Sequence, residues 1–162
     1  MAYDTEKAWK FIGKFRAPML VTLAEDGPRA RPMNAIVKPE EGAIWFLSEA
    51  SSSKDAEARA EPRVNVVFSD GGQNHASVQG TATEVHDRET VKRLWNPGAQ
   101  AWWPQGPEDP NIVAIRVTPD EAEIWDGDPS VVAFAKMGVA IATKSVPDAG
   151  DHVRTTLTAV QD

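Results

Sequence analysis

A hydroxyl-rich segment, residues 51–54 (Ser-Ser-Ser-Lys), directly follows a short apolar run at 43–47. The apolar run predicts a buried strand, and the segment after it predicts the start of a helix. Hydroxyl groups, the backbone N–H groups of a helix N-terminus and an ammonium group would then converge, which suits a phosphate dianion. Arg31, on the preceding predicted strand, would add a bidentate contact. The alternative is that Ser53 only caps the helix and Lys54 is solvated.

Tryptophan is unusually frequent, with six residues against one tyrosine. Trp45 and Trp125 fall in predicted strands, where core packing explains them. Trp102 and Trp103 are adjacent in a segment, 96–110, that is rich in proline and glycine. Two interpretations stay open for this pair: the rings cover a flat aromatic ligand or a partner subunit, or they pack within their own loop.

Other catalytic chemistries lack the residues that they need. The chain has no cysteine, and its three histidines lie far apart, so the sequence predicts no metal site. It contains neither a Gly-x-Ser-x-Gly motif nor a Gly-x-x-x-x-Gly-Lys-Ser/Thr phosphate loop. The carboxylates are scattered, and no pair stands out as general acid and base. We therefore assign no catalytic residue and no metal ligand.

The composition is that of a soluble globular protein. The chain has 162 residues, 41% of them hydrophobic, and a net charge of −7, which predicts one domain. The acidic balance argues against nucleic acid as a partner. No apolar run approaches the roughly 18 residues of a membrane span, and the first residues do not resemble a signal peptide. We expect a cytoplasmic protein, with which the absence of cysteine agrees.

Short strands joined by tight turns dominate the predicted elements. Helices are expected near residues 5–15, 54–60, 87–95 and 130–142, and strands near 19–23, 29–37, 43–47, 63–68, 75–85, 112–117 and 122–125. This pattern favours a mainly β (α+β) fold, a six- to seven-stranded antiparallel split β-barrel with peripheral helices, over a parallel sheet. We expect residues 1–145 to form this domain and 146–162 to form a flexible polar tail.

The order of several short motifs resembles the FMN-binding split β-barrel superfamily, whose best-known member is pyridoxamine 5′-phosphate oxidase. The motifs are Arg31-Pro32-Met33, Ile44-Trp45-Phe46-Leu47-Ser48, Ser52-Ser53-Lys54 and Glu61-Pro62-Arg63-Val64. The general stress protein type branch is the more similar one, because the later segments at 75–80, 87–95 and 121–125 also agree with it. The resemblance covers about residues 5–135.

The resemblance implies a homodimer with one FMN at each of two sites along the interface. The phosphate would be held by Arg31, Ser52, Ser53 and Lys54. The ribityl chain and the isoalloxazine ring would lie along Pro32, Met33, Trp45, Phe46, Leu47 and Ser48. The second subunit would contribute residues around His75 and Ser77, together with Trp102 or Trp103.

Three functions remain open on this basis. The first is an FMN-dependent oxidoreductase, in which the flavin supplies the redox chemistry. The second is a flavin-binding stress protein that stores, delivers or senses FMN. The third is a protein with the same barrel that binds FAD, a deazaflavin or haem in place of FMN. Haem fits least, because the histidines are scattered. Oxidation of vitamin B6 is not expected, because the chain lacks the Arg-Leu-x-Pro type segment that completes the substrate site of the oxidases.

Overall fold

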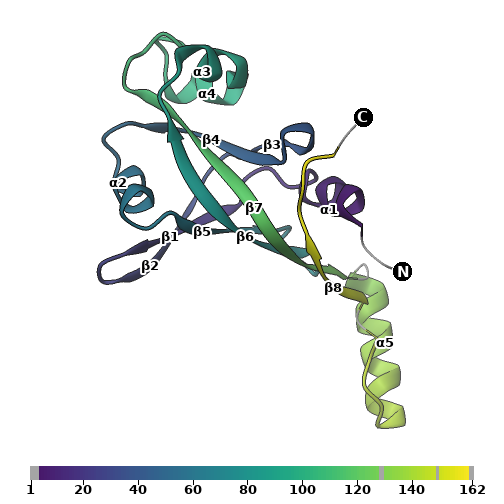
Figure 1. Cartoon of the computed structure of the whole chain (residues 1–162). Helices are drawn as coiled ribbons and strands as arrows, with labels where there is room; N and C mark the ends of the chain where they lie inside the picture. The colour runs from purple at the N-terminus through teal and green to yellow at the C-terminus, as the bar shows by residue number, and fades with distance from the viewer. Residues whose placement is uncertain (1–3, 128–129, 149, 161–162) are drawn as a thin grey trace.

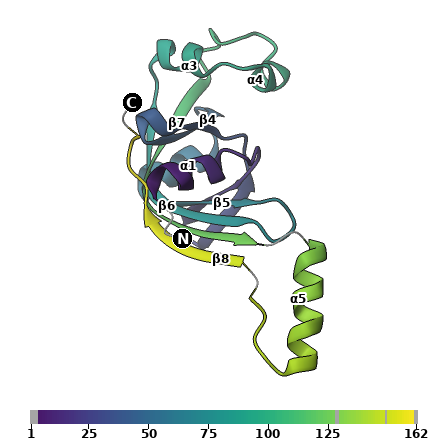
Figure 2. The same ribbon diagram turned by 90° about the vertical axis from the view of Figure 1, so that its right-hand side faces the viewer.

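The computed structural model describes residues 4–127, 130–148 and 150–160, without the side chains of residues 53–55 and 130–131. Its centre is an eight-stranded antiparallel sheet in the order β2-β1-β5-β6-β7-β4-β3, with β8 paired to β7. The strands are β1 (Met19–Ala24), β2 (Gly27–Pro32), β3 (Ile36–Lys38), β4 (Ala43–Glu49), β5 (Arg63–Ser69), β6 (His75–Val85), β7 (Ile112–Gly127) and β8 (Gly150–Thr156). The sheet curves around α1, as Figures 1 and 2 show. The predicted fold class, a mainly β split barrel with peripheral helices, is confirmed.

The helices lie around this sheet. They are α1 (Thr5–Ile12), α2 (Ser53–Ala60), α3 (Arg88–Leu94), α4 (Pro97–Trp102) and α5 (Ser130–Thr143), with a 3-10 turn η1 at Pro39–Glu41. Side-chain caps determine where two of them begin: Asp4 accepts a hydrogen bond from the Lys7 amide, and Asp87 from the Thr90 amide. The segment expected to be irregular, 96–110, contains α4, which Asn96 caps through the Ala99 amide.

Two hydrophobic cores lie on opposite faces of β4. Phe46 belongs to the main core, which α1 fills with Trp9, while Trp45 and Leu47 belong to a smaller core beneath α3 and α4. A strand that is covered on both faces shows no alternation of apolar and polar residues. This explains the continuous apolar run at 43–47, whereas β5, covered on one face, alternates as predicted.

Strand β7 replaces two predicted strands that were expected to be joined at Pro119. It is continuous over 16 residues. Along one edge, β4 pairs with residues 112–117 and β8 pairs with 121–127, so Pro119 lies between the two ladders and its missing N–H costs no hydrogen bond there. On the other edge the register shifts at Gln79 and Gly80. A Cβ atom on Gly80 would lie 2.4 Å from the Thr118 carbonyl oxygen, so only glycine fits there.

The C-terminal segment is ordered where a flexible tail was expected. Residues 150–156 form β8 along β7, and Leu157 is buried in the main core. The indole N–H of Trp9 donates to the Thr158 carbonyl oxygen (2.8 Å), and the Val160 amide donates to that of Pro39 (2.9 Å). The polar composition did not reveal this strand, because its hydrogen bonds are made by the backbone and most of its side chains are exposed.

Helix α5 projects from the end of β7, away from the barrel, in both views (Figures 1 and 2). It was predicted at 130–142 and is confirmed at Ser130–Thr143. Among the described residues, no helix is long and apolar enough to cross a membrane.

Candidate functional site

A cleft of about 620 Å³ opens where β2 and β4 end and α4 passes over them. This volume lies within the range of small-molecule and cofactor sites. Seven of the predicted binding residues line the cleft, namely Arg31, Pro32, Met33, Leu47, Ser48, Trp102 and Trp103. Segments that are distant in the sequence thus form one concave surface.

One end of the cleft is cationic. Arg31 Nη2 contacts Glu57 Oε2 at 2.8 Å, and Nη1 donates to Thr22 Oγ1 at 2.9 Å. Thr22 in turn donates its hydroxyl to Glu57. The hydrogen bond from Thr22 lowers the pKa of Glu57 most, and the hydrogen bond and positive charge of Arg31 lower it further, against the opposing effect of burial. Because a guanidinium has further N–H donors, these contacts orient Arg31 and still allow it to bind an anion.

Two serine hydroxyls lie beside this cationic end. Ser52 occupies the N-cap position of α2, and its Oγ lies 3.2 Å from Ser48 Oγ. Ser48 is one of two buried polar residues in the described chain. The N-cap was expected at Ser53, but in the structure it is the preceding residue, Ser52. The side chains of Ser53 and Lys54 lie outside those described, and their role at a phosphate stays a prediction.

The lining of the cleft also contains two tryptophans, Trp102 and Trp103. Trp103 is partly buried, and its ring centroid lies 6.3 Å from that of Trp95. Trp102, the last residue of α4, is 74% exposed. Packing within the loop therefore applies to Trp103, which lies against the smaller core. Trp102 projects into solvent at the rim of the cleft, so for this residue a contact with a ligand or a partner stays open.

Trp45 and Phe46 lie on β4, but neither side chain lines the cleft. Phe46 is fully buried in the main core. Trp45 donates its indole N–H to Glu41 Oε2 (2.8 Å), and the guanidinium of Arg93 lies 5.5 Å from its ring centroid. Of the predicted β4 residues, only Leu47 and Ser48 reach the lining.

His75 and Ser77 do not line this cleft within one chain. They are at the start of β6, where His75 pairs with Trp125 of β7. Ser77 lies three strands across the sheet from Pro32, because Ser77 pairs with Val67, Val67 with Met19 and Met19 with Pro32. At about 4.8 Å between neighbouring strands, this separation is about 14 Å. That these residues reach the cleft of a second copy stays a prediction.

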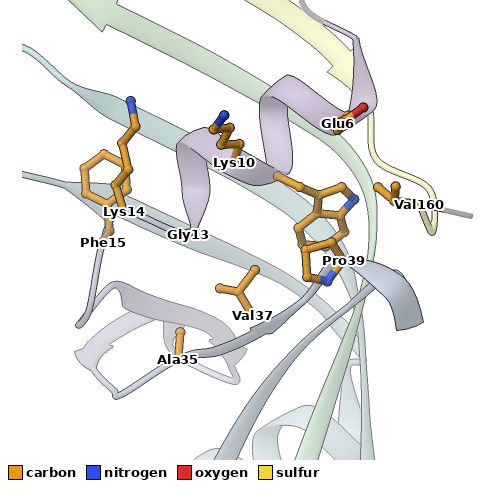
Figure 3. Close-up of a pocket in the computed structure, with 10 residues that line it drawn as sticks. Glu6, Lys10, Gly13, Lys14, Phe15, Ala35, Val37, Pro39 and Val160 are labelled. Atoms are coloured by element: carbon orange, nitrogen blue, oxygen red, sulfur yellow. The ribbon is translucent and has the colours of Figure 1, made fainter. Parts of the chain in front are cut away.

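A second cavity, of about 530 Å³, lies between α1 and β3 (Figure 3). Lys10 extends from α1 and Lys14 from the turn after it, while Ala35 and Val37 lie across the cavity from them. Its lining contains none of the predicted binding residues. It consists of Glu6, Trp9, Lys10, Gly13, Lys14, Phe15, Ala35, Val37, Pro39 and Val160. We therefore take the cleft at Arg31 as the candidate site.

Comparison with known proteins identifies the family of the chain. Residues 3–148 match the model of the family described as "Pyridoxamine 5′-phosphate oxidase like". The chain belongs to this pyridoxamine 5′-phosphate oxidase-like family.

Several similar solved structures are described as general stress proteins. A general stress FMN/FAD binding protein of Xanthomonas citri is 38% identical, with a TM-score of 0.66 over 78% of this chain and 90% of that one. A general stress protein 26 of Jannaschia sp. CCS1 is 27% identical, with a TM-score of 0.74 over 94% of this chain and 97% of that one. Protein bli-3 of Neurospora crassa is 33% identical over 94 residues, which are 51% of this chain but only 45% of bli-3.

Several residues of the site in this family member were not predicted from the sequence. Thr22 and Glu57 hold Arg31, and the cleft is also lined by Ala17, Asn34, Ile36, Glu49, Asn96 and Ala99. Asn34 and Glu49 directly follow predicted motifs, so extending those motifs by one residue would have found them. Glu57 carried no such signal, because a glutamate on an exposed-looking helix is usually solvated. Among the described residues, no group of histidine, aspartate and glutamate is arranged to hold a metal ion.

Proposed function

We propose that the chain binds FMN in the cleft and acts as a flavin-dependent oxidoreductase. The observation that carries the proposal is the composition of the cleft, whose lining combines the Arg31 guanidinium and Ser48 with apolar side chains and two tryptophans. The Ser52 hydroxyl adjoins it through Ser48. FMN has a matching set of chemical groups: a phosphate, a polar chain and a flat ring. The Xanthomonas citri protein, which is described as FMN/FAD binding, supports the proposal.

Each part of the cleft has a distinct task in this proposal. Arg31 and the Ser52 hydroxyl bind the phosphate at the N-terminus of α2, and Ser53 and Lys54 follow as further ligands. Pro32, Met33 and Leu47 hold the chain and the ring and exclude water from them.

Bound FMN would supply the electron transfer, which needs no catalytic side chain of the protein. The task of the protein residues is to orient the ring and to determine which molecules reach it. The site is completed in a homodimer, where His75 and Ser77 of the second copy face the flavin. FAD or a deazaflavin would use the same apolar residues of the cleft.

Absorption spectra of the purified protein, taken before and after incubation with FMN and removal of free ligand, test cofactor binding. We expect flavin bands and quenched flavin fluorescence. Anaerobic mixing of the loaded protein with NADH or NADPH then tests turnover. Bleaching of the flavin bands within seconds supports an oxidoreductase, whereas retained flavin without reduction by any donor supports a flavin-binding protein.

Comparing FMN with riboflavin tests the phosphate end of the cleft. The wild type should bind FMN more tightly, and Arg31→Ala should weaken FMN binding about 10- to 100-fold while leaving riboflavin binding nearly unchanged. Arg63→Ala is the matched control, because Arg63 is more exposed, pairs with Glu61 and does not line the cleft. Equal affinity of wild type and Arg31→Ala for FMN would place the phosphate elsewhere.

A further inference from the structure

The exposed apolar side chains of the described residues are concentrated on α5 and the segment after it. The large ones there are Val132, Phe134, Met137, Val139, Ile141 and Val146. Elsewhere in the described chain, the large exposed apolar side chains are Met19 and Leu23 on β1 and Trp102 on α4. We call residues 130–148, which comprise α5 and the segment that returns alongside it in Figures 1 and 2, the arm.

The arm is apolar around its whole circumference. Ala133 and Ala140 share one helix face and are buried. Phe134 and Ile141 share another face and are 74% and 75% exposed, and Val132 and Val139 lie on a third. A helix that is apolar on every side is normally buried. A patch of this kind on a protein surface marks an interaction site.

A second copy of the chain fits this surface better than a lipid bilayer does. The helix has 14 residues and a length of about 21 Å, too short for the roughly 30 Å hydrocarbon core. It also lacks the basic face of a helix that lies on a membrane, since Lys136 is its one charged residue. The net charge of −7 would further oppose binding to anionic lipids.

The position of the arm indicates where it docks on the second copy. The arm follows one end of the 16-residue strand β7, and α4, whose Trp102 lines the cleft, lies toward the other end of it (Figure 1). A two-fold axis that passes beside the middle of β7, perpendicular to the strand, brings the arm of each copy to α4 of the other. Such an interface is self-complementary, because each copy offers both surfaces.

We propose that the arm of each copy packs across α4 of the other copy at Trp102 and closes the mouth of its cleft. The contact would cover Phe134 and Ile141 on one side and the exposed Trp102 ring on the other. That the covered cleft holds a flavin rests on the proposed function, but the contact between arm and α4 does not.

The side chains that the contact would cover supply part of an interface. Phe134, Ile141 and Trp102 are each about three-quarters exposed, so together they offer on the order of 450 Å² per chain. A stable interface buries about 800 Å² per partner, so this contact supplies about half of that area.

Disulfide trapping tests the contact, because the natural chain contains no cysteine. Trp102→Cys and Phe134→Cys are prepared separately, mixed and oxidised, and compared on non-reducing gels with each variant alone. Both positions are exposed, so folding should tolerate the changes, and circular dichroism checks that it does. The distance between these two ends of one chain forbids a bridge within it.

We expect a covalent dimer in the mixture and little in either variant alone. A dimer formed mainly by Phe134→Cys alone would show that two arms pair with each other, and would overturn the proposal. A mixture that stays uncrosslinked while light scattering reports a dimer would also overturn it, as would flotation of the wild type with phosphatidylcholine vesicles.

A charge variant supplies an independent measurement. Phe134→Glu combined with Ile141→Glu should shift the species in light scattering from dimer to monomer, whereas Leu23→Glu, the same kind of change on an exposed β1 side chain, should leave the dimer intact. Flavin content is recorded in parallel by absorption. Crosslinking without flavin would refute only the proposed function, and flavin binding without crosslinking would refute only the role of the arm.

Discussion

The cleft at Arg31 and the cavity between α1 and β3 have similar volumes, about 620 and 530 Å³, but different construction. The cleft joins the ends of two strands and a distant helix, and it combines a held guanidinium, hydroxyls and tryptophan rings. The cavity is lined largely by α1 and by residues packed on the main core, and its lysines lie at the rim. Volume therefore does not distinguish the two, whereas the residue types and the contacts that orient them do.

The comparison predicts that tryptophans in the two places have different tasks. Trp9, in the cavity, is fully buried and anchors the C-terminal segment through Thr158. Trp9→Ala should lower the free energy of unfolding by about 3–5 kcal/mol, because it removes a large core side chain. Urea denaturation followed by circular dichroism measures this loss. A loss below 1 kcal/mol would show that α1 is not part of the folding core.

Substitution of Glu57 tests whether its ion pair with Arg31 stabilises the folded chain. Glu57→Gln should lower the free energy of unfolding by about 1–3 kcal/mol, because the Arg31 and Thr22 partners lose a charged acceptor. The mutant protein should keep its secondary structure. Unfolding curves for the mutant that superimpose on those of the wild type would show that the ion pair contributes nothing.

The same carboxylate predicts a pH dependence. The pKa of Glu57 is lowered in the folded chain, so its contribution to stability is present above the ordinary carboxyl pKa and is lost as the pH falls through the lower folded value. Between pH 6 and pH 3 the wild type should therefore lose more stability than Glu57→Gln does. Urea midpoints across this range provide the measurement, and parallel curves for the two proteins would contradict the shift.

Trp103→Ala sharpens the comparison at the tryptophans that line the cleft. The side chain is partly buried beside Trp95, so we expect a loss of about 1–2 kcal/mol in stability, smaller than for Trp9. Flavin affinity and the quenching of flavin fluorescence should both decrease. If both stay at the wild-type level while stability falls, Trp103 serves only the packing of its own loop.

The smallest effects are expected at the rim of the cavity. Lys10→Ala and Lys14→Ala should each change the free energy of unfolding by less than about 0.5 kcal/mol, because both residues are exposed. Neither should change FMN binding, in contrast to Arg31→Ala. Loss of FMN in either lysine variant would mean that the cavity, and not the cleft, holds the ligand.

The sequence by itself determined the local elements and the residue types of the site. Alternation in β5, the caps at Asp4 and Asp87 and the order of the motifs at 31–33, 44–48 and 52–54 act over a few residues, so they could be predicted from local patterns.

Only the tertiary structure decided which of these residues meet. It buried Phe46 and Trp45 in two cores, brought Trp103, which follows α4, to the cleft of Arg31, and left His75 outside the lining of that cleft. It also paired Arg31 with Glu57 and fixed residues 150–156 as a strand. These outcomes depend on strand order and backbone pairing between distant segments, and no local pattern of side chains encodes either of them.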